Sequence, residues 1–359
     1  MTQTMTTKAT TTMRPALRRG LLLAALGAGL YALLLGLLWF QQERLLFQPA
    51  PLAAGHRFAL GDDVHERWID VPGARLNALH LRLPKPDGLV FFLHGNGGNL
   101  QNWFTNADFY RRLNLDLFII DYRGYGKSSG RIDSQAQLEA DVRAAWDAVA
   151  PMYAGQRRIV YGRSLGTGLA ATLAADVQPE LTVLVSPYTS MTALAGEHYA
   201  WVPSAVLRYP LHTDDALLRI EGDVLLVHGE RDTLISAEHS RRLQALAPRA
   251  KLLLVPDAGH NDIHRFETYL DGLRAIYRPS ESATHSLPRR TQAPSAATCC
   301  GGVHAGDGAV GGGRGAGDPI QGHAAAVPVS GTNLRPASTS RSARGARPAS
   351  FSTSPVTMS

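Results

Sequence analysis

Short apolar runs recur along the middle of the chain, between polar segments that contain glycine or proline. In residues 89–93, Leu-Val-Phe-Phe-Leu, no polar residue interrupts the run, which is typical of a strand buried on both faces of a sheet. Two earlier runs are separated only by Pro72-Gly73-Ala74, which predicts a β-hairpin. The predicted strands cover residues 68–71, 76–83, 89–93, 115–120, 159–161, 181–185, 224–228 and 252–255.

Helical patterns alternate with these strands. The clearest is segment 134–153, whose apolar residues recur every three or four positions. Helices are also predicted over 101–113, 237–246 and 263–277, and directly after the fifth strand. Alternation of this kind predicts an α/β fold with a mostly parallel sheet flanked by helices on both faces. In such sheets, functional residues lie beyond the carboxyl ends of the strands.

The longest apolar run is uncharged and covers residues 21–40. At about 1.5 Å per residue, a helix of this length reaches about 30 Å, the thickness of a bilayer core. A cleaved signal peptide is the alternative, but its apolar region is usually about 7–15 residues and ends at small residues. We therefore predict one N-terminal transmembrane helix. Basic residues precede it, so the positive-inside rule predicts a cytoplasmic N-terminus and a body outside the cytoplasm, in the periplasm of a bacterium.

Composition divides the rest of the chain. We expect residues 1–20 to be a disordered cytoplasmic N-terminus, 41–60 a linker and 61–278 one folded domain. Residues 279–359 are rich in Gly, Ala, Ser, Pro and Arg and show no periodicity, so we expect a disordered low-complexity tail. The tail also resembles out-of-frame translation of a GC-rich gene, a hypothesis that sequencing the message across codons 275–285 decides.

The net charge of +6 and the pI of about 9.5 would ordinarily suggest a nucleic-acid partner. However, residues 1–20 carry four basic residues and no acid, and residues 281–359 carry seven arginines against three acids, so each flank contributes +4. Residues 21–280 are left with −2, and we expect no nucleic-acid partner. The only cysteines, Cys299 and Cys300, lie in the tail, so no thiol nucleophile, metal site or cofactor is predicted for the body.

The fifth strand runs into Gly162-Arg163-Ser164-Leu165-Gly166 and then a helix. This is the G-x-S-x-G pattern in a strand–turn–helix setting, where a sharp turn exposes the serine hydroxyl. Both glycines are expected because a Cβ there would crowd the strand or the helix start. The helix N-terminus offers the Leu165 N–H to a developing oxyanion. The alternative is a glycine-flanked serine in an ordinary tight turn.

Two later strands are followed by side chains that could activate a nucleophilic serine. Asp232 lies in the turn after strand 224–228 and can orient a histidine, with Glu230 as the second choice. His260 lies between the last strand and the last helix, where a general base could reach Ser164. In these roles His260 removes the serine proton and Asp232 holds the imidazole in the right tautomer. Hydrolysis would then run through an acyl-enzyme.

Two glycine-rich loops follow the third and fourth strands. The first, His94-Gly95-Asn96-Gly97-Gly98-Asn99, allows close backbone approach to a bound group. A phosphate-binding loop is its alternative, but the G-K-[S/T] ending is missing. We expect its histidine to be a structural hydrogen-bonding group, and Asp121 and Arg123 of the second loop to tie loops together. Other histidines, including His80 and His239, are expected to be solvated.

Together these motifs resemble those of the α/β-hydrolase superfamily, over about Leu45 to Tyr277. H-G-N-G-G-N, D-Y-R-G-Y-G-x-S, G-x-S-L-G and H-G-x-x-D are most similar to a membrane-anchored serine hydrolase branch. That branch includes lysophospholipases, monoacylglycerol lipases and acyl-protein thioesterases. The resemblance implies an α/β-hydrolase catalytic domain with the triad order Ser164, Asp232, His260. It also implies a second oxyanion N–H from Asn96.

The connection after the sixth strand bears on the substrate. It runs from Ser186 to Gly222, which leaves room for one or two helices and not for a large lid. Its apolar residues, with Tyr188 and Trp201 as the predicted substrate contacts, suggest a shallow acyl groove near the membrane. The alternative is that these residues only pack against the sheet. An open groove beside an anchor suits lipid or lipidated-protein esters.

The leading hypothesis is a membrane-anchored serine hydrolase that cleaves carboxylic esters or thioesters of lipid or acyl type. A serine peptidase on the same fold is one alternative, but it would usually carry an added domain that excludes large chains. A non-catalytic, membrane-tethered binding protein is the other alternative. Loss of a triad residue would be its signature, and all three are present.

Overall fold

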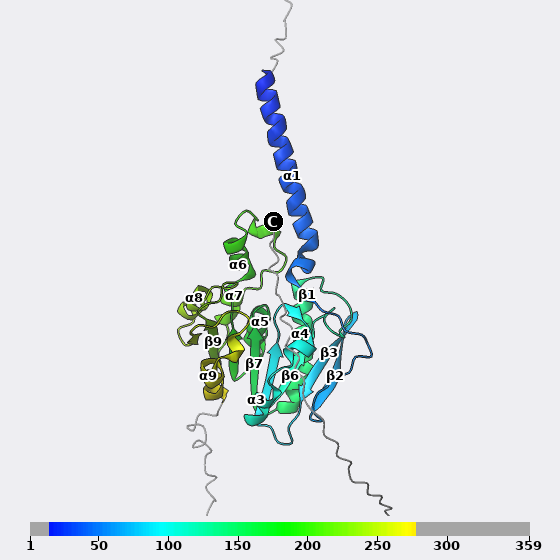
Figure 1. The fold of residues 1–359 in the computed structure, drawn as a ribbon, viewed down its shortest axis with the longest axis vertical. Helices are drawn as coiled ribbons and strands as arrows, with labels where there is room; N and C mark the ends of the chain where they lie inside the picture. The colour runs from blue at the N-terminus through cyan, green and yellow to red at the C-terminus, as the bar shows by residue number, and fades with distance from the viewer. Residues whose placement is uncertain (1–13, 278–359) are drawn as a thin grey trace, which may run out of the picture. The chain divides into compact units, whose positions relative to one another are not determined.

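The computed structural model of the protein describes residues 14–277 (Figure 1). The tail predicted to be disordered, 279–359, and most of the N-terminal segment predicted to be disordered lie outside these residues. The disorder expected for these two segments therefore stays a prediction.

An eight-stranded sheet carries the fold, in the order β10-β9-β8-β7-β4-β6-β3-β2. β2 pairs with β3 and β3 pairs with β6 in antiparallel register, and the other pairings are parallel. The mostly parallel sheet of the prediction is confirmed. The strands are β2 Val64–Val71, β3 Ala74–Leu81, β4 Gly88–Leu93, β6 Leu115–Ile120, β7 Arg157–Arg163, β8 Leu181–Val185, β9 Asp223–Gly229 and β10 Lys251–Val255.

Helices cover both faces of this sheet, as the alternation of strands and helices predicts. α4, α5, α7 and α8 pack with one apolar cluster, and α2, α3 and α9 pack with the other. The helices of the body are α2 Leu100–Trp103, α3 Ala107–Arg112, α4 Gln135–Val149, α5 Gly166–Val177, α6 Met191–His198, α7 Thr213–Leu217, α8 Glu238–Leu246 and α9 Glu267–Tyr277, with short 3₁₀ turns at Ala150–Tyr153, Ser204–Val206 and Ile263–Arg265.

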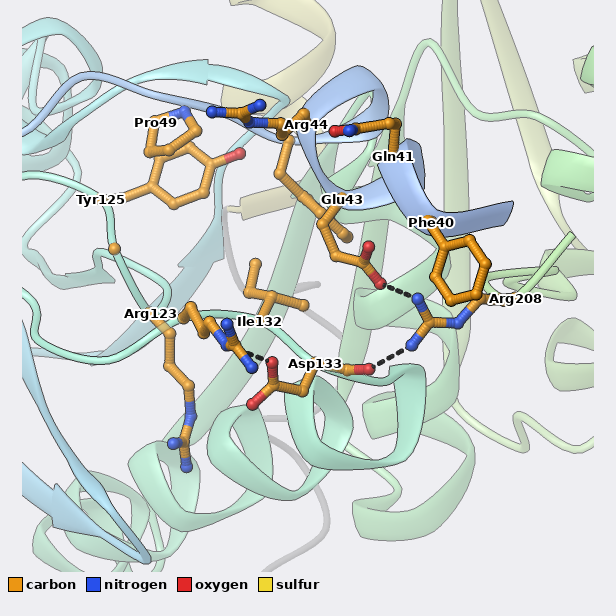
Figure 2. Close-up of a pocket in the computed structure, with 13 residues that line it drawn as sticks. Phe40, Gln41, Glu43, Arg44, Pro49, Arg123, Tyr125, Ile132, Asp133 and Arg208 are labelled. Atoms are coloured by element: carbon orange, nitrogen blue, oxygen red, sulfur yellow. Dashed lines mark hydrogen bonds and ion pairs between the residues drawn. The ribbon is translucent and has the colours of Figure 1, made fainter. Parts of the chain in front are cut away.

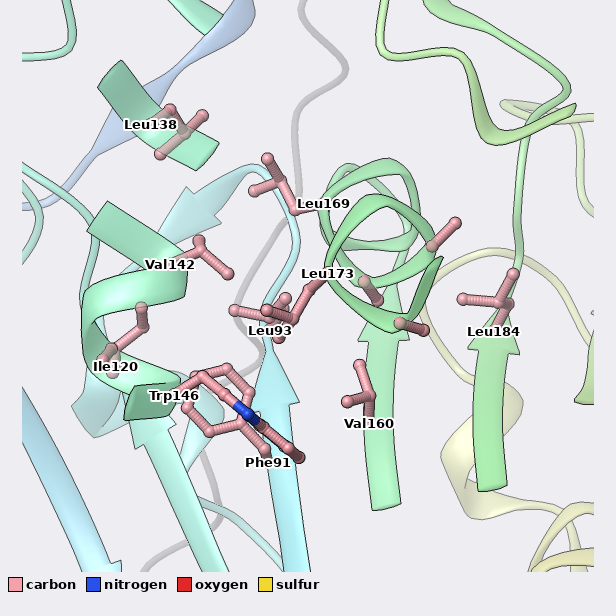
Figure 3. Close-up of a cluster of buried hydrophobic side chains, with 14 of the residues drawn as sticks. Phe91, Leu93, Ile120, Leu138, Val142, Trp146, Val160, Leu169, Leu173 and Leu184 are labelled. Atoms are coloured by element: carbon pink, nitrogen blue, oxygen red, sulfur yellow. The ribbon is translucent and has the colours of Figure 1, made fainter. Parts of the chain in front are cut away.

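Side chains of β4 alternate between the two clusters because successive strand residues point to opposite faces. Phe91 belongs to the cluster under α4 and α5, where it meets Trp146 edge-on with ring centroids 5.4 Å apart (Figure 3). Phe92 belongs to the opposite cluster and packs on Tyr161. Both faces of β4 are thus buried, which explains its unbroken apolar run.

Two segments differ from the prediction. The helix expected over 101–113 is split into α2 and α3, because Asn106 takes a left-handed conformation with φ of 58° between them. The N-terminal helix α1, Pro15–Leu46, starts inside the segment expected to be disordered and continues into the expected linker. By length and composition α1 is the one helix among the described residues able to cross a membrane, and a signal sequence near the N-terminus would meet the same criteria.

Candidate active site

Ser164 lies at the turn between β7 and α5 with a left-handed φ of 52°. Its backbone N–H donates to the carbonyl of Val185 in β8 over 2.9 Å, which ties the turn to the next strand. A Cβ on Gly166 would lie 2.2 Å from the carbonyl oxygen of Leu93, and one on Gly162 would lie 2.5 Å from the Cβ of Ala170. The structure therefore gives the physical reason for both glycines of the G-x-S-x-G pattern.

Ser164, His260 and Asp232 come from three different loops and meet at this turn. His260 Nε2 lies 3.0 Å from Ser164 Oγ, and His260 Nδ1 lies 2.7 Å from Asp232 Oδ2. Because a carboxylate only accepts, the proton of a neutral imidazole sits on Nδ1. Nε2 is then free to accept the serine proton, which is the arrangement a general base needs.

Asp232 is almost fully buried and its carboxylate is well supplied with donors. Its Oδ1 accepts from the backbone N–H groups of Leu234, at 3.0 Å, and Ile235, at 2.8 Å. Burial alone would raise the pKa of Asp232, but donors on His228, His260 and Ile235 outweigh it and hold the pKa well below its usual range. The side chain therefore stays ionised, as orienting an imidazolium requires.

His228 is a second histidine beside the carboxylate that the sequence did not single out. Its Nε2 lies 2.8 Å from the carbonyl of Ile235 and 3.5 Å from Asp232 Oδ2, so its proton goes chiefly to the carbonyl. Nδ1 pairs with Ser240 at 2.7 Å. His228 thus braces the loop that carries Asp232. Glu230, the second choice for the acid, is exposed and lies outside the hydrogen-bonded chain.

Two backbone N–H groups, those of Leu165 and Asn96, are the predicted donors to an oxyanion. Leu165 directly precedes α5, and Asn96 lies in the loop after β4. Within residues 14–277, neither of these two N–H groups donates a hydrogen bond to the protein. Asn96 itself is held on two sides: the Gln48 N–H donates to its Oδ1 over 3.0 Å, and the Tyr125 hydroxyl donates to its carbonyl over 2.6 Å.

The segment after α1 supports the Asn96 loop directly. β1, Gln48–Pro49, pairs in parallel with β5, Gly97–Gly98. Asn99 Nδ2 also donates to the carbonyl of Ala50 over 2.8 Å. The sequence predicts only a linker here, because a two-residue strand has no periodic pattern and its partner lies some fifty positions away.

The end of α1 is joined to the connection after β8. Gln42 is buried, donates to the Val206 carbonyl over 2.7 Å and accepts from the Arg208 N–H over 2.8 Å. Glu43 accepts from the Tyr209 hydroxyl at 2.8 Å and pairs with Arg208 at 2.5 Å. The same helix end therefore contacts this connection and leads into the strand beside the Asn96 loop.

A cavity of about 660 Å³ lies beside this helix end (Figure 2). Arg208 stands on one side of it, paired with Glu43 and with the carbonyl of Asp133. None of the residues that line this cavity is Ser164, His260 or Asp232, so its position does not mark the candidate active site.

The two predicted substrate contacts differ in their surroundings. Tyr188 is fully buried, and its hydroxyl donates to the carbonyl of Leu165 over 2.9 Å. It supports the first turn of α5 from inside the core, so the prediction of a substrate contact is wrong for Tyr188. Trp201 is 47% exposed, and its carbonyl accepts from the Tyr31 hydroxyl over 2.8 Å. For Trp201 the substrate contact stays a prediction.

The expectation that His80 and His239 are solvated is also wrong. His80 is fully buried against the Tyr153 hydroxyl at 2.7 Å, and burial lowers its pKa to about 3. His239 is buried beside Glu197, 3.2 Å away, and burial lowers its pKa. Arg123 behaves as expected: it pairs with Asp141 and donates to a backbone carbonyl.

One group of side chains is close enough to share a cation. His212, Asp214 and Asp215 offer ligand atoms within 4.8 Å of one another. They are exposed or half-buried, so water solvates them well, and we assign no metal site to them.

Comparison with known proteins agrees with this architecture. Residues 84–217 match the family model described as serine aminopeptidase, S33. An uncharacterized protein of Mycobacterium tuberculosis is 34% identical over 242 residues, which span 63% of this chain and 82% of the relative. Alpha/beta hydrolase domain-containing protein 17C of Xenopus tropicalis is 32% identical over 233 residues, which span 62% of this chain and 70% of the relative.

Among solved structures, an esterase of Pyrococcus furiosus matches with a TM-score of 0.52 and 18% identity. The match covers 64% of this chain and 96% of the esterase, and at this identity it shows the fold alone. The sequence relatives and the family model carry the relationship further. The chain therefore belongs to the α/β-hydrolase superfamily.

Proposed function

We propose that this protein is a membrane-anchored serine hydrolase that cleaves carboxylic esters or thioesters of lipid-like acyl groups. The observation that carries the proposal is the continuous contact from Ser164 Oγ to His260 and from His260 to the buried carboxylate of Asp232, at 3.0 and 2.7 Å. Such a chain activates a hydroxyl that is a poor nucleophile on its own.

The reaction follows from these positions. His260 Nε2 takes the proton as Ser164 Oγ attacks the ester carbonyl, and Asp232 stabilises the imidazolium that forms. The N–H groups of Leu165 and Asn96 bind the oxyanion of the tetrahedral intermediate. His260 then returns the proton to the leaving alkoxide or thiolate. Water attacks the acyl-enzyme in the same way and releases the acid.

The lipid-like substrate is inferred from the surroundings of the site. α1 is long and apolar enough to cross a bilayer, and its last turn contacts the connection after β8 through Gln42 and Glu43. That connection is short, with α6, one 3₁₀ turn and α7, and it exposes Tyr199 and Trp201. The carbonyl of Trp201 accepts a hydrogen bond from Tyr31 of α1. A site on such an anchor would meet acyl chains at the membrane surface.

The test uses the full chain in phospholipid nanodiscs with p-nitrophenyl esters of two to sixteen carbons, a palmitoyl thioester and an aminoacyl p-nitroanilide. We expect wild type to hydrolyse the esters and the thioester and to hydrolyse the anilide little. Ser164→Ala should hydrolyse none of these substrates. Preference for the anilide would favour the peptidase alternative. Binding without turnover by a folded wild type would favour the non-catalytic alternative.

We also propose the orientation that the basic residues before α1 suggest, with the N-terminus in the cytoplasm and the catalytic domain outside. Protease added to right-side-out vesicles should then degrade the domain. Protection in right-side-out vesicles together with degradation in inverted ones would reverse the orientation. Release of the domain as a soluble protein would identify α1 as a cleaved signal sequence.

A further inference from the structure

His94, at the start of the Asn96 loop, is bonded to the peptide that carries the Asn96 N–H. Its Nδ1 lies 2.7 Å from the carbonyl oxygen of Gly95. A carbonyl oxygen only accepts, so Nδ1 carries a proton and donates it. The Gly95 carbonyl and the Asn96 N–H belong to one planar trans peptide and point in opposite directions. Holding the carbonyl therefore sets the direction of the N–H.

Asp121 faces the other edge of the same ring. His94 Nε2 lies 3.5 Å from Asp121 Oδ1, and both side chains are fully buried. Among the described residues, His94 Nε2 and both carboxylate oxygens of Asp121 are buried and have no hydrogen-bond partner. Nε2 and Oδ1 face each other at 3.5 Å, and one proton between them would supply the partner that buried polar groups require.

The pair is closely packed on several sides. A Cβ on Gly126 would lie 1.9 Å from Asp121 Oδ2, so the glycine lets the loop close over the carboxylate. The His94 ring lies between Trp103, with ring centroids 5.6 Å apart, and Tyr122, at 4.3 Å. The Tyr122 hydroxyl also donates to the His94 carbonyl over 2.9 Å. Ring and backbone of His94 are thus both fixed.

We propose that His94 and Asp121 form a positioning pair that aims the Asn96 N–H at the oxyanion. Neither residue touches the substrate. Asp121 orients the ring, the ring holds the Gly95 carbonyl, and that peptide presents the N–H beside the Leu165 N–H. The inference rests on the proposed function, since it assigns a role within the same site.

Two amide variants of His94 separate the positioning role from simple packing. In His94→Asn the amide nitrogen is two bonds from Cβ, like Nδ1, and keeps the donor to the Gly95 carbonyl. In His94→Gln it is three bonds away, like Nε2, and loses that donor. We expect His94→Asn to keep kcat within about threefold of wild type. We expect His94→Gln to lower kcat by about 10- to 100-fold, less than the loss of a whole oxyanion donor.

The KM for a short p-nitrophenyl ester should stay within about twofold in both variants, because ground-state binding does not use the oxyanion N–H. Affinity for a trifluoromethyl ketone, which forms the tetrahedral oxyanion, should fall in parallel with kcat/KM. For the other half of the pair, Asp121→Asn can donate to an unprotonated Nε2 and should resemble wild type. Asp121→Ala should resemble His94→Gln.

Equal kcat values in His94→Asn and His94→Gln, with both folded by circular dichroism, would overturn the inference. So would a loss of kcat/KM that comes entirely from a higher KM. If either His94 variant fails to fold, the Asp121→Asn and Asp121→Ala pair decides by the same criteria. These outcomes leave the proposed function intact, since that fails if Ser164→Ala retains hydrolysis, if the folded wild type has none, or if the anilide is the preferred substrate.

Discussion

Replacing Asp232 by asparagine should disable the base while it preserves the fold. In the structure, Oδ1 accepts from the Leu234 and Ile235 N–H groups, at 3.0 and 2.8 Å, and Oδ2 faces His260 Nδ1 at 2.7 Å. Only an oxygen can accept both N–H groups, so the amide oxygen takes the Oδ1 position. The NH₂ group is then directed at His260.

The magnitude follows from the tautomer. Facing a donor, His260 Nδ1 must accept, and the ring proton moves to Nε2, 3.0 Å from Ser164 Oγ. A protonated Nε2 cannot take the serine proton. In a serine protease with the same arrangement, the Asp→Asn change lowers kcat by about 10⁴. That factor corresponds to about 5.5 kcal/mol of transition-state stabilisation.

The assay is kcat for a short p-nitrophenyl ester at pH 7.5, with Asp232→Asn compared to wild type after both pass a thermal-unfolding check. Glu230→Gln is the matched control, because this neighbouring carboxylate is exposed and outside the hydrogen-bonded chain. We expect the control to keep full activity. A residual kcat above about a tenth of wild type in Asp232→Asn would refute the assignment of the acid.

Three further outcomes are expected. The pKa of Asp232 is lowered in the folded protein, so the ionised side chain stabilises the fold fully above the unfolded pKa of about 4, and this stabilisation is lost as the pH falls toward the lowered pKa. Between pH 5 and 3, denaturant unfolding should show a steeper loss of stability in wild type than in Asp232→Asn, and parallel curves would contradict this. Gly166→Ala places a Cβ 2.2 Å from a backbone oxygen and should destabilise the folded protein by about 2–4 kcal/mol. Gly196→Ala, in open space within α6, should instead stabilise it by up to about 1 kcal/mol in the same unfolding assay. Equal effects of the two substitutions would count against the close approach at Gly166. Gln42→Leu removes two hydrogen bonds to the connection after β8 and should lower its local stability by about 1–3 kcal/mol. Trypsin should therefore cut that connection faster than in wild type, whereas the Gln41→Leu protein, changed at an exposed site, should be cut at the wild-type rate.

Local patterns predict most of the fold. The strands are recognised because each is a short apolar run between turn residues, and the fold class follows from their alternation with helices. The break before α3 is missed because the segment has a helical sequence pattern, whereas α2 ends at Trp103 and the left-handed Asn106 caps the start of α3. The extension of α1 to Leu46 is missed because residues 41–44 are polar and are held by contacts to residues 206–209.

The candidate site, like the fold, is only partly predictable from local sequence patterns. Ser164, Asp232 and His260 are found from the sequence because each follows a strand, and the carboxyl ends of parallel strands meet at one edge of the sheet. The burial of Tyr188, the bracing by His228 and the pairing of β1 with the Asn96 loop depend on partners far along the chain. No local pattern carries that information. The catalytic roles themselves are predictions that enzymology must test.

The most direct test of the central claim is fluorophosphonate labelling of membranes that contain the full-length protein, beside Ser164→Ala. We expect a covalent adduct on wild type, mapped by mass spectrometry to the peptide of Ser164, and none on Ser164→Ala. An adduct that persists in Ser164→Ala, or no adduct on folded wild type, would contradict the claim that His260 and Asp232 activate this serine.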